Sequence, residues 1–147
     1  MRSCLGIWVI FAVGCGSSGG GGNPDASAPT IAVTGAPANG TTVKNDNMAA
    51  DGITLTVTVT GGVTLVDPNT HSTDVAGQGH FHVYLDSETS YLTYQFTTPV
   101  QVAIPMRVTA SAAPGTPHTL HVALETNTHS PYPGASPSNT IMFNAVQ

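Results

Sequence analysis

Residues 53–60 read Ile-Thr-Leu-Thr-Val-Thr-Val-Thr, a strict alternation of apolar side chains with threonine. Successive side chains of a β-strand point to opposite faces, so this segment predicts a strand with one buried and one wet face. Weaker runs with the same period of two lie at residues 31–34, 63–66, 80–86, 91–97, 100–106, 118–126 and 140–146. Turns rich in Gly and Pro separate these runs, and no segment shows a sustained helical period. The sequence therefore predicts an all-β domain, an immunoglobulin-like Greek-key β-sandwich of seven or eight strands.

The N-terminal segment differs in composition from the rest of the chain. Arg2 precedes an apolar run at residues 5–13. This run is too short for a helix that crosses about 30 Å of hydrocarbon, and it fits a secretory signal peptide. It ends in Ala-Val-Gly before Cys15 and resembles a bacterial lipobox, in which the cysteine receives diacylglycerol and the preceding segment is removed. Residues 16–22 are all Gly or Ser, as in a flexible linker.

These features divide the chain into three parts. We expect a lipoprotein signal peptide over residues 1–14, a lipidated Cys15 and linker over 15–29, and the β-sandwich domain over 30–147. Resemblance to the sorting rule of Gram-negative lipoproteins implies the outer membrane, because residue 16 is Gly rather than Asp. The expected location is therefore the cell envelope, with the lipid as the membrane anchor.

The charge balance excludes one class of partner. The formal net charge is −5, and only 7% of the residues are charged. Once residues 1–14 are removed, Lys44 and Arg107 are the remaining cations, too few to neutralise a run of phosphates. We therefore expect no nucleic-acid partner, and membrane attachment through lipid rather than through charge.

Histidines are the most informative residues of the predicted domain. In the 80–86 strand, His80 and His82 share one face while the apolar residues between them point into the core. The 118–126 strand places His121 on its own polar face, and immunoglobulin-type sheets make two such strands neighbours. His80, His82 and His121 could then bind Zn²⁺ or Cu²⁺ through imidazole nitrogens.

Two carboxylates are candidates to complete or orient this metal site, Asp86 and Glu125. The alternative interpretation is that these histidines belong to a polar outer face with no ligand. His118 lies in register with inward residues, so we expect it to be buried and bonded to backbone. His129 lies in a turn-rich segment, for which a loop-stabilising role is expected, and His71 is expected to be solvated.

The histidine segments resemble an uncharacterised family of short exported bacterial sandwich domains, a domain-of-unknown-function family with a Gly-x-Gly-His-x-His motif. The resemblance covers residues 77–143. It implies the fold and export rather than an activity. The positions that carry it are Gly79, His80, His82, Asp86, His118, Asn127, His129 and Pro131.

No catalytic motif is found in the sequence. There is no Gly-x-Ser-x-Gly elbow, no His-Glu-x-x-His segment and no phosphate-binding glycine loop before a helix. We therefore expect a non-enzymatic, lipid-anchored envelope protein without a cofactor, a binding or structural module. Two alternatives remain: a periplasmic or surface Cu or Zn protein, and an adhesin-like domain that contacts an envelope protein or polysaccharide through Tyr91 and Tyr94.

Overall fold

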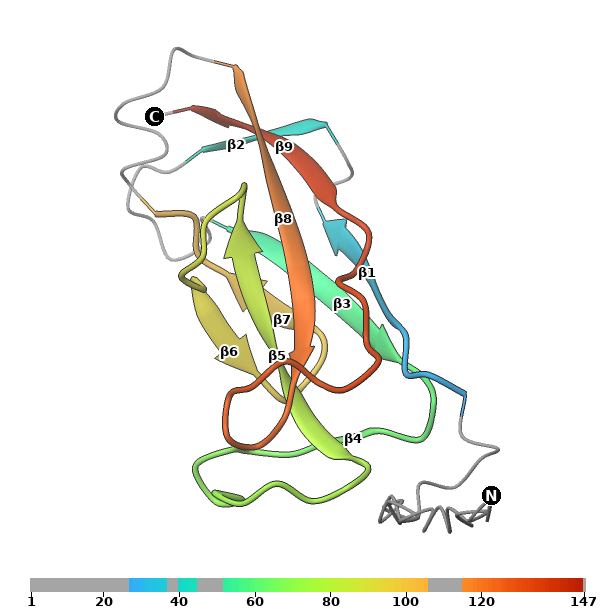
Figure 1. The fold of residues 1–147 in the computed structure, drawn as a ribbon. Coiled ribbons are helices and arrows are strands. Elements are labelled where there is room, and N and C mark those ends of the chain that lie inside the picture. The colour runs from blue at the N-terminus through green and yellow to red at the C-terminus, as the bar shows by residue number, and fades with distance from the viewer. Residues whose placement is uncertain (1–26, 37–39, 45–51, 106–114, 147) are drawn as a thin grey trace, which may run out of the picture.

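The computed structural model describes residues 27–36, 40–44, 52–105 and 115–146. Nine strands and no helix lie in these ranges, so the described chain is all-β (Figure 1). The strands are β1 (Ile31–Ala36), β2 (Thr41–Lys44), β3 (Ile53–Val59), β4 (Thr64–Leu65), β5 (Gln78–Leu85), β6 (Thr93–Gln95), β7 (Val100–Val102), β8 (Thr116–Glu125) and β9 (Ile141–Val146). The predicted signal peptide, Cys15 and most of the linker lie outside the described residues. Within the described ranges, no helix could span a membrane.

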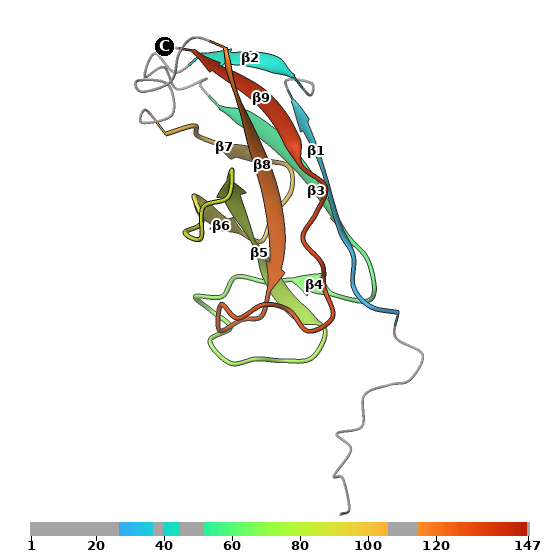
Figure 2. The same cartoon turned by 45° about the horizontal axis from the view of Figure 1, so that its top comes forward.

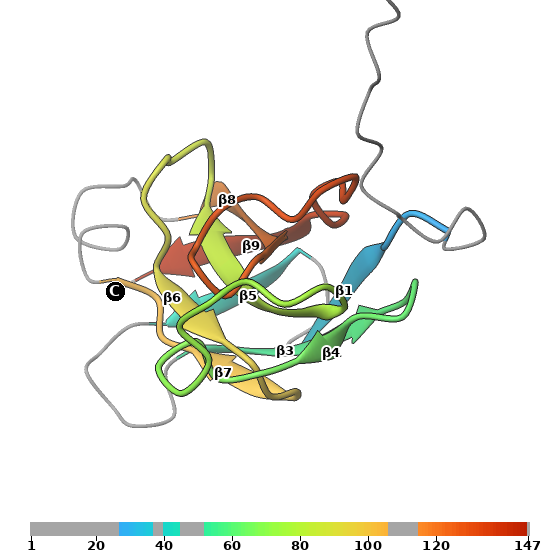
Figure 3. The same cartoon turned by 60° about the horizontal axis from the view of Figure 1, so that its bottom comes forward.

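The strands form two sheets, which lie as two layers when the molecule is viewed from its lower end (Figure 3). The smaller sheet has the order β1-β3-β7 and is antiparallel. The larger sheet has the order β2-β9-β8-β5-β4, with β6 also paired to β5. Figure 2 shows β2 beside β9, where the two strands run parallel.

Both sheets contribute to one apolar core. In β3 the alternation is reproduced residue by residue: Ile53, Leu55 and Val57 are buried, and the threonines between them are exposed. Phe81 and Val83 of β5 are completely buried in the same cluster. Burial of each such side chain stabilises the fold by about 1.5–3 kcal/mol. The hydrophobic period of two therefore determines which face of each sheet points inward.

Each of the eight predicted runs contains a strand, although the strands in residues 63–66, 91–97 and 100–106 are shorter than predicted. Among the nine described strands, β2 is the one that was not predicted. Its four residues, Thr-Thr-Val-Lys, offer too short an alternation to be recognised. They become a strand because β9 presents a free edge in parallel register.

β5 differs from β3 because it is buried on both faces. It pairs antiparallel with β8, as predicted for the two histidine-bearing strands, with His80 opposite Glu125, His82 opposite Ala123 and Tyr84 opposite His121. Below this pair, the green segment before β5 and the orange-red segment after β8 lie at the same end of the molecule (Figure 1). The sequence suggested that the polar face of β5 is exposed to solvent. In the structure this face is covered.

Candidate metal centre

Three imidazole nitrogens meet above the covered face of β5. The Nε2 atoms of His80 and His82 lie 2.9 Å apart. Nδ1 of His129 lies 3.1 Å from the first and 2.9 Å from the second. Among the described residues, these three side chains are the one group of three or more His, Cys, Asp or Glu residues whose ligand atoms lie close enough together to hold a metal ion. We call His80, His82 and His129 the histidine triangle.

Two of these ligand atoms are positioned by strand geometry. His80 and His82 are two residues apart in β5, so their side chains leave the same face of the sheet. Both side chains are buried, at 0% and 3% exposure, respectively. Their positions are therefore set by the sheet itself.

The third ligand comes from the loop that follows β8. His129 adopts a positive φ of 59°, a conformation that non-glycine residues seldom take. The turn around it is closed by hydrogen bonds from His129 N–H to the Thr126 carbonyl and from Thr126 N–H to the Ser130 carbonyl. Because Glu125 at the end of β8 lies opposite His80, this turn returns directly over the two strand histidines.

The loop that holds His129 is also tied to the segment before β5. Thr128 donates its backbone N–H and its hydroxyl to the two carboxylate oxygens of Asp74, at 2.9 and 2.8 Å. The buried Asn127 donates from Nδ2 to the Thr73 carbonyl at 2.9 Å. These bonds connect the two loops on either side of the third ligand.

Aromatic rings surround the histidine triangle. The Tyr91 ring lies 4.0 Å from the ring of His82, between centroids, and the Tyr94 ring lies 5.7 Å from that of His80. Burial first, and then charge on the neighbouring histidines, lowers the pKa of both His80 and His82 to about 4. At neutral pH both imidazoles are therefore uncharged, the form that binds metal.

A hydrogen-bond chain sets the tautomer of His82. The Tyr84 hydroxyl donates to the carboxylate of the buried Glu125 and lies 3.3 Å from His82 Nδ1. When the Tyr84 hydroxyl donates to an ionised Glu125, its oxygen can accept a hydrogen bond from Nδ1–H of His82. Nε2 of His82 then presents its lone pair to the triangle. Glu125, one of the two carboxylates that the sequence suggested, is thus connected to His82 through Tyr84.

His121 does not lie in the triangle, although the sequence placed it there. It shares the outer face with His80 and His82, but the register puts it opposite Tyr84. The Tyr84 and His121 rings stack at 5.1 Å between centroids, so the tyrosine separates His121 from His82. The third nitrogen beside His80 and His82 therefore comes from His129 and not from His121, because Tyr84 lies between His121 and His82.

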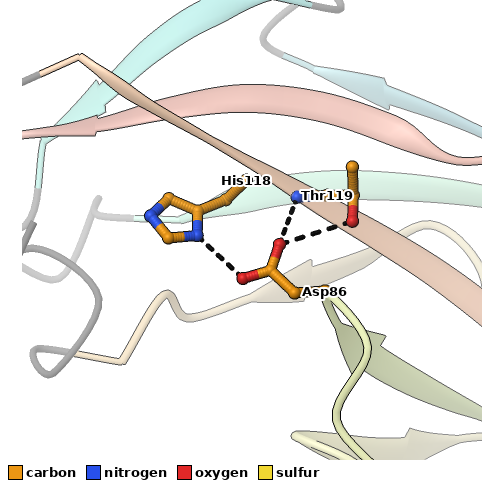
Figure 4. A network of polar contacts seen from close by, with 3 residues as sticks. All are labelled: Asp86, His118 and Thr119. Atoms are coloured by element: carbon orange, nitrogen blue, oxygen red, sulfur yellow. Dashed lines mark hydrogen bonds and ion pairs between the residues drawn. The ribbon is translucent and has the colours of Figure 1, made fainter.

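Asp86 does not support the metal site either, because it bonds to His118 (Figure 4). His118 Nδ1 donates to one carboxylate oxygen at 2.8 Å, and the Thr119 N–H donates to the other at 2.8 Å. Burial raises the pKa of Asp86, but these bonds outweigh it and hold the pKa below its ordinary value. The His118 side chain is thus largely buried, at 14% exposure, and bonded to a carboxylate, where the sequence suggested a bond to backbone. The pair fastens the turn after β5 to β8.

Two other residues of the predicted motif, Gly79 and Pro131, affect how closely the backbone segments approach each other. A Cβ at Gly79 would collide with the Glu125 carbonyl oxygen, so this glycine permits close approach of the chains. Pro131 forms an isolated bridge with Glu125. His71 is exposed, as expected, and its Nδ1 lies 2.9 Å from the Thr70 hydroxyl.

His129 is the ligand that sequence reasoning assigned to a different role. Periodicity cannot place a residue of an irregular loop, and the loop conformation depends on a positive φ. The available signal is the strand register: with His80 opposite Glu125, any histidine shortly after residue 125 passes near His80. Comparisons of the chain with protein-family models, curated proteins and solved structures found no match.

Proposed function

We propose that this protein is a metal-binding protein of the cell envelope that holds Zn²⁺ or Cu²⁺ on His80, His82 and His129. The observation that carries this proposal is the separation of the three nitrogens, 2.9–3.1 Å on every side of the triangle. With metal–nitrogen bonds of about 2.0–2.1 Å, an ion could contact all three with small adjustments.

Hydrogen bonding alone does not account for the histidine triangle. Each nitrogen directs either an N–H or a lone pair toward the other two. In a group of three, at most two of the three contacts can join an N–H to a lone pair. The third contact is repulsive, and a buried repulsive contact is costly. A cation bound by three lone pairs removes this conflict.

The donor set narrows the choice of metal. Imidazole nitrogens suit Zn²⁺, Cu²⁺ and Ni²⁺, whereas Ca²⁺ and Mg²⁺ prefer oxygen. Among divalent first-row ions, Cu²⁺ binds a given nitrogen site most tightly. We expect the order of affinity to be Cu²⁺ above Zn²⁺.

The wider setting is also part of the proposal. The apolar run at residues 5–13, Cys15 and the glycine-rich linker support export and a lipid anchor in the outer membrane. A shared core between two sheets supports an immunoglobulin-like Greek-key β-sandwich. The proposed role is binding rather than catalysis. A Cys15→Ser variant expressed in a Gram-negative host should fail to incorporate labelled palmitate, and persistent labelling would refute the anchor.

Calorimetric titration of the full chain with Zn²⁺ and Cu²⁺ tests the metal site. Cys4 and Cys15 should first be replaced by Ser, so that thiols contribute no heat. We expect a dissociation constant below about 10 μM, equivalent to about 7 kcal/mol. His129→Ala should weaken binding by at least about 100-fold.

Two matched controls make this test specific. His121→Ala lies on the same face but outside the triangle, and His71→Ala removes an exposed imidazole. Both variants should bind like the parent chain. Equal losses in His121→Ala and His129→Ala would reject the triangle as the site, and so would a parent chain that binds neither ion.

A further inference from the structure

The size of the histidine triangle limits the coordination geometry. Nitrogens 2.9–3.1 Å apart subtend about 90–100° at an ion with bonds of about 2.0–2.1 Å. Three ligands at such angles occupy one side of the ion. The opposite side needs at least one further donor, because these metals take four or more ligands.

The described residues offer no fourth histidine, cysteine or carboxylate to the group. The hydroxyl of Tyr84 faces the other nitrogen of His82. The hydroxyl of Tyr94 accepts a hydrogen bond from Asn69 Nδ2 at 2.9 Å. The Tyr91 ring packs against the imidazole of His82, with 4.0 Å between the ring centroids and an angle of 43° between the ring planes.

Solvent can reach the third ligand. His129 is exposed, in contrast to the two strand histidines, and the adjacent Tyr91 is 43% exposed. The Tyr91 and His129 rings are nearly parallel, with 6.4 Å between centroids. One side of the triangle therefore borders water, with an aromatic ring as its margin.

We propose that an ion held by the triangle keeps an open coordination position that takes a small monodentate donor from solution, such as water, hydroxide or azide. This inference rests on the proposed metal site. Structural zinc sites are closed by four protein ligands, whereas sites with three protein ligands exchange the fourth. The Tyr91 ring restricts the position to small donors.

Cobalt substitution tests the open position on the full chain with Cys4→Ser and Cys15→Ser. The visible bands of bound Co²⁺ report its coordination, so their appearance and their loss in His129→Ala test the metal site first. Azide is then titrated into the cobalt-loaded chain. We expect a saturable shift of the bands, and an unchanged spectrum with cobalt bound would overturn the open position while leaving the metal site intact.

Two further variants separate an open position from one filled by a tyrosine. Tyr91→Phe and Tyr94→Phe remove the hydroxyls and keep the rings. Both should respond to azide as the parent does. A parent that fails to respond beside a Phe variant that responds would assign the position to that phenol and overturn the proposal. Absence of cobalt bands in the parent would reject the metal site and the open position together.

Discussion

Thr128 and Asp74 lie 54 residues apart in sequence and are joined by two hydrogen bonds to one carboxylate. Together these bonds fix the backbone of the residue before His129. We therefore expect the pair to act on the proposed metal by placing its third ligand.

Replacing Thr128 by Val removes one of these bonds and keeps the shape of the side chain. We expect zinc affinity to fall by about 10-fold, the lower end of the effects seen for residues that orient metal ligands. Thr128→Ser keeps the hydroxyl and should bind like the parent. Calorimetry on both variants checks this, and equal affinities for Val and Ser would mean that the Asp74 bond does not position His129.

Tyr84→Phe should weaken metal binding and also destabilise the fold. The variant removes the acceptor of His82 Nδ1–H and the donor to the buried Glu125. We expect about 10-fold weaker zinc binding. The free energy of unfolding in urea should fall by about 1–3 kcal/mol, because a buried acceptor loses its partner.

Tyr91→Phe is the matched control for Tyr84→Phe, since it removes a tyrosine hydroxyl at the margin of the same site. It should leave both quantities unchanged. Zinc affinity equal in Tyr84→Phe and the parent would show that Tyr84 does not orient His82.

The metal-free protein should lose stability as the pH falls from about 6.5 to about 4. In this window the unfolded chain protonates His80 and His82 while the folded chain does not. The slope is about 1.4 kcal/mol per pH unit for each proton of difference. Burial lowers the pKa of His121, which adds to the loss, and raises that of Glu125, which opposes it.

Urea unfolding at pH 7, 6 and 5 in the presence of a chelator measures this dependence. His82→Gln removes one of the titrating groups and should flatten the profile. A parent profile that is already flat, or a His82→Gln profile as steep as the parent's, would contradict the assignment of the pH dependence to the triangle.

Asp86→Ala should destabilise the protein without affecting metal binding. The variant removes the acceptor for His118 and for the Thr119 N–H, and we expect a loss of about 1–2 kcal/mol. Asp86 has a positive φ of 52°, which Asn tolerates better than Ala, so Asp86→Asn should be the milder variant. Weaker zinc binding in either variant would mean that this residue does reach the metal site.

The sequence pattern predicted the sheets better than the site. Alternation placed eight strands, because a period of two follows directly from burial of one face. The pairing of β5 with β8 was predicted from the strand order of immunoglobulin-type sheets. Alternation also placed His80 and His82 on one face. It misassigned His121. The pattern predicts on which face of the sheet a side chain lies, but it does not predict that Tyr84 fills the space between His121 and His82. It assigned no ligand role to His129, whose place depends on a turn and on contacts with a distant loop.

The ligands of the histidine triangle come from distant parts of the chain, since His82 and His129 are 47 residues apart. Both cysteines precede residue 16, so no disulfide can join these segments. A bound ion would act as the missing cross-link. It would favour the folded chain over the unfolded one, by about 2.7 kcal/mol at a free concentration 100 times its dissociation constant. The domain would then be more stable where the metal is abundant than where it is depleted, and its lifetime against proteases would follow the metal supply.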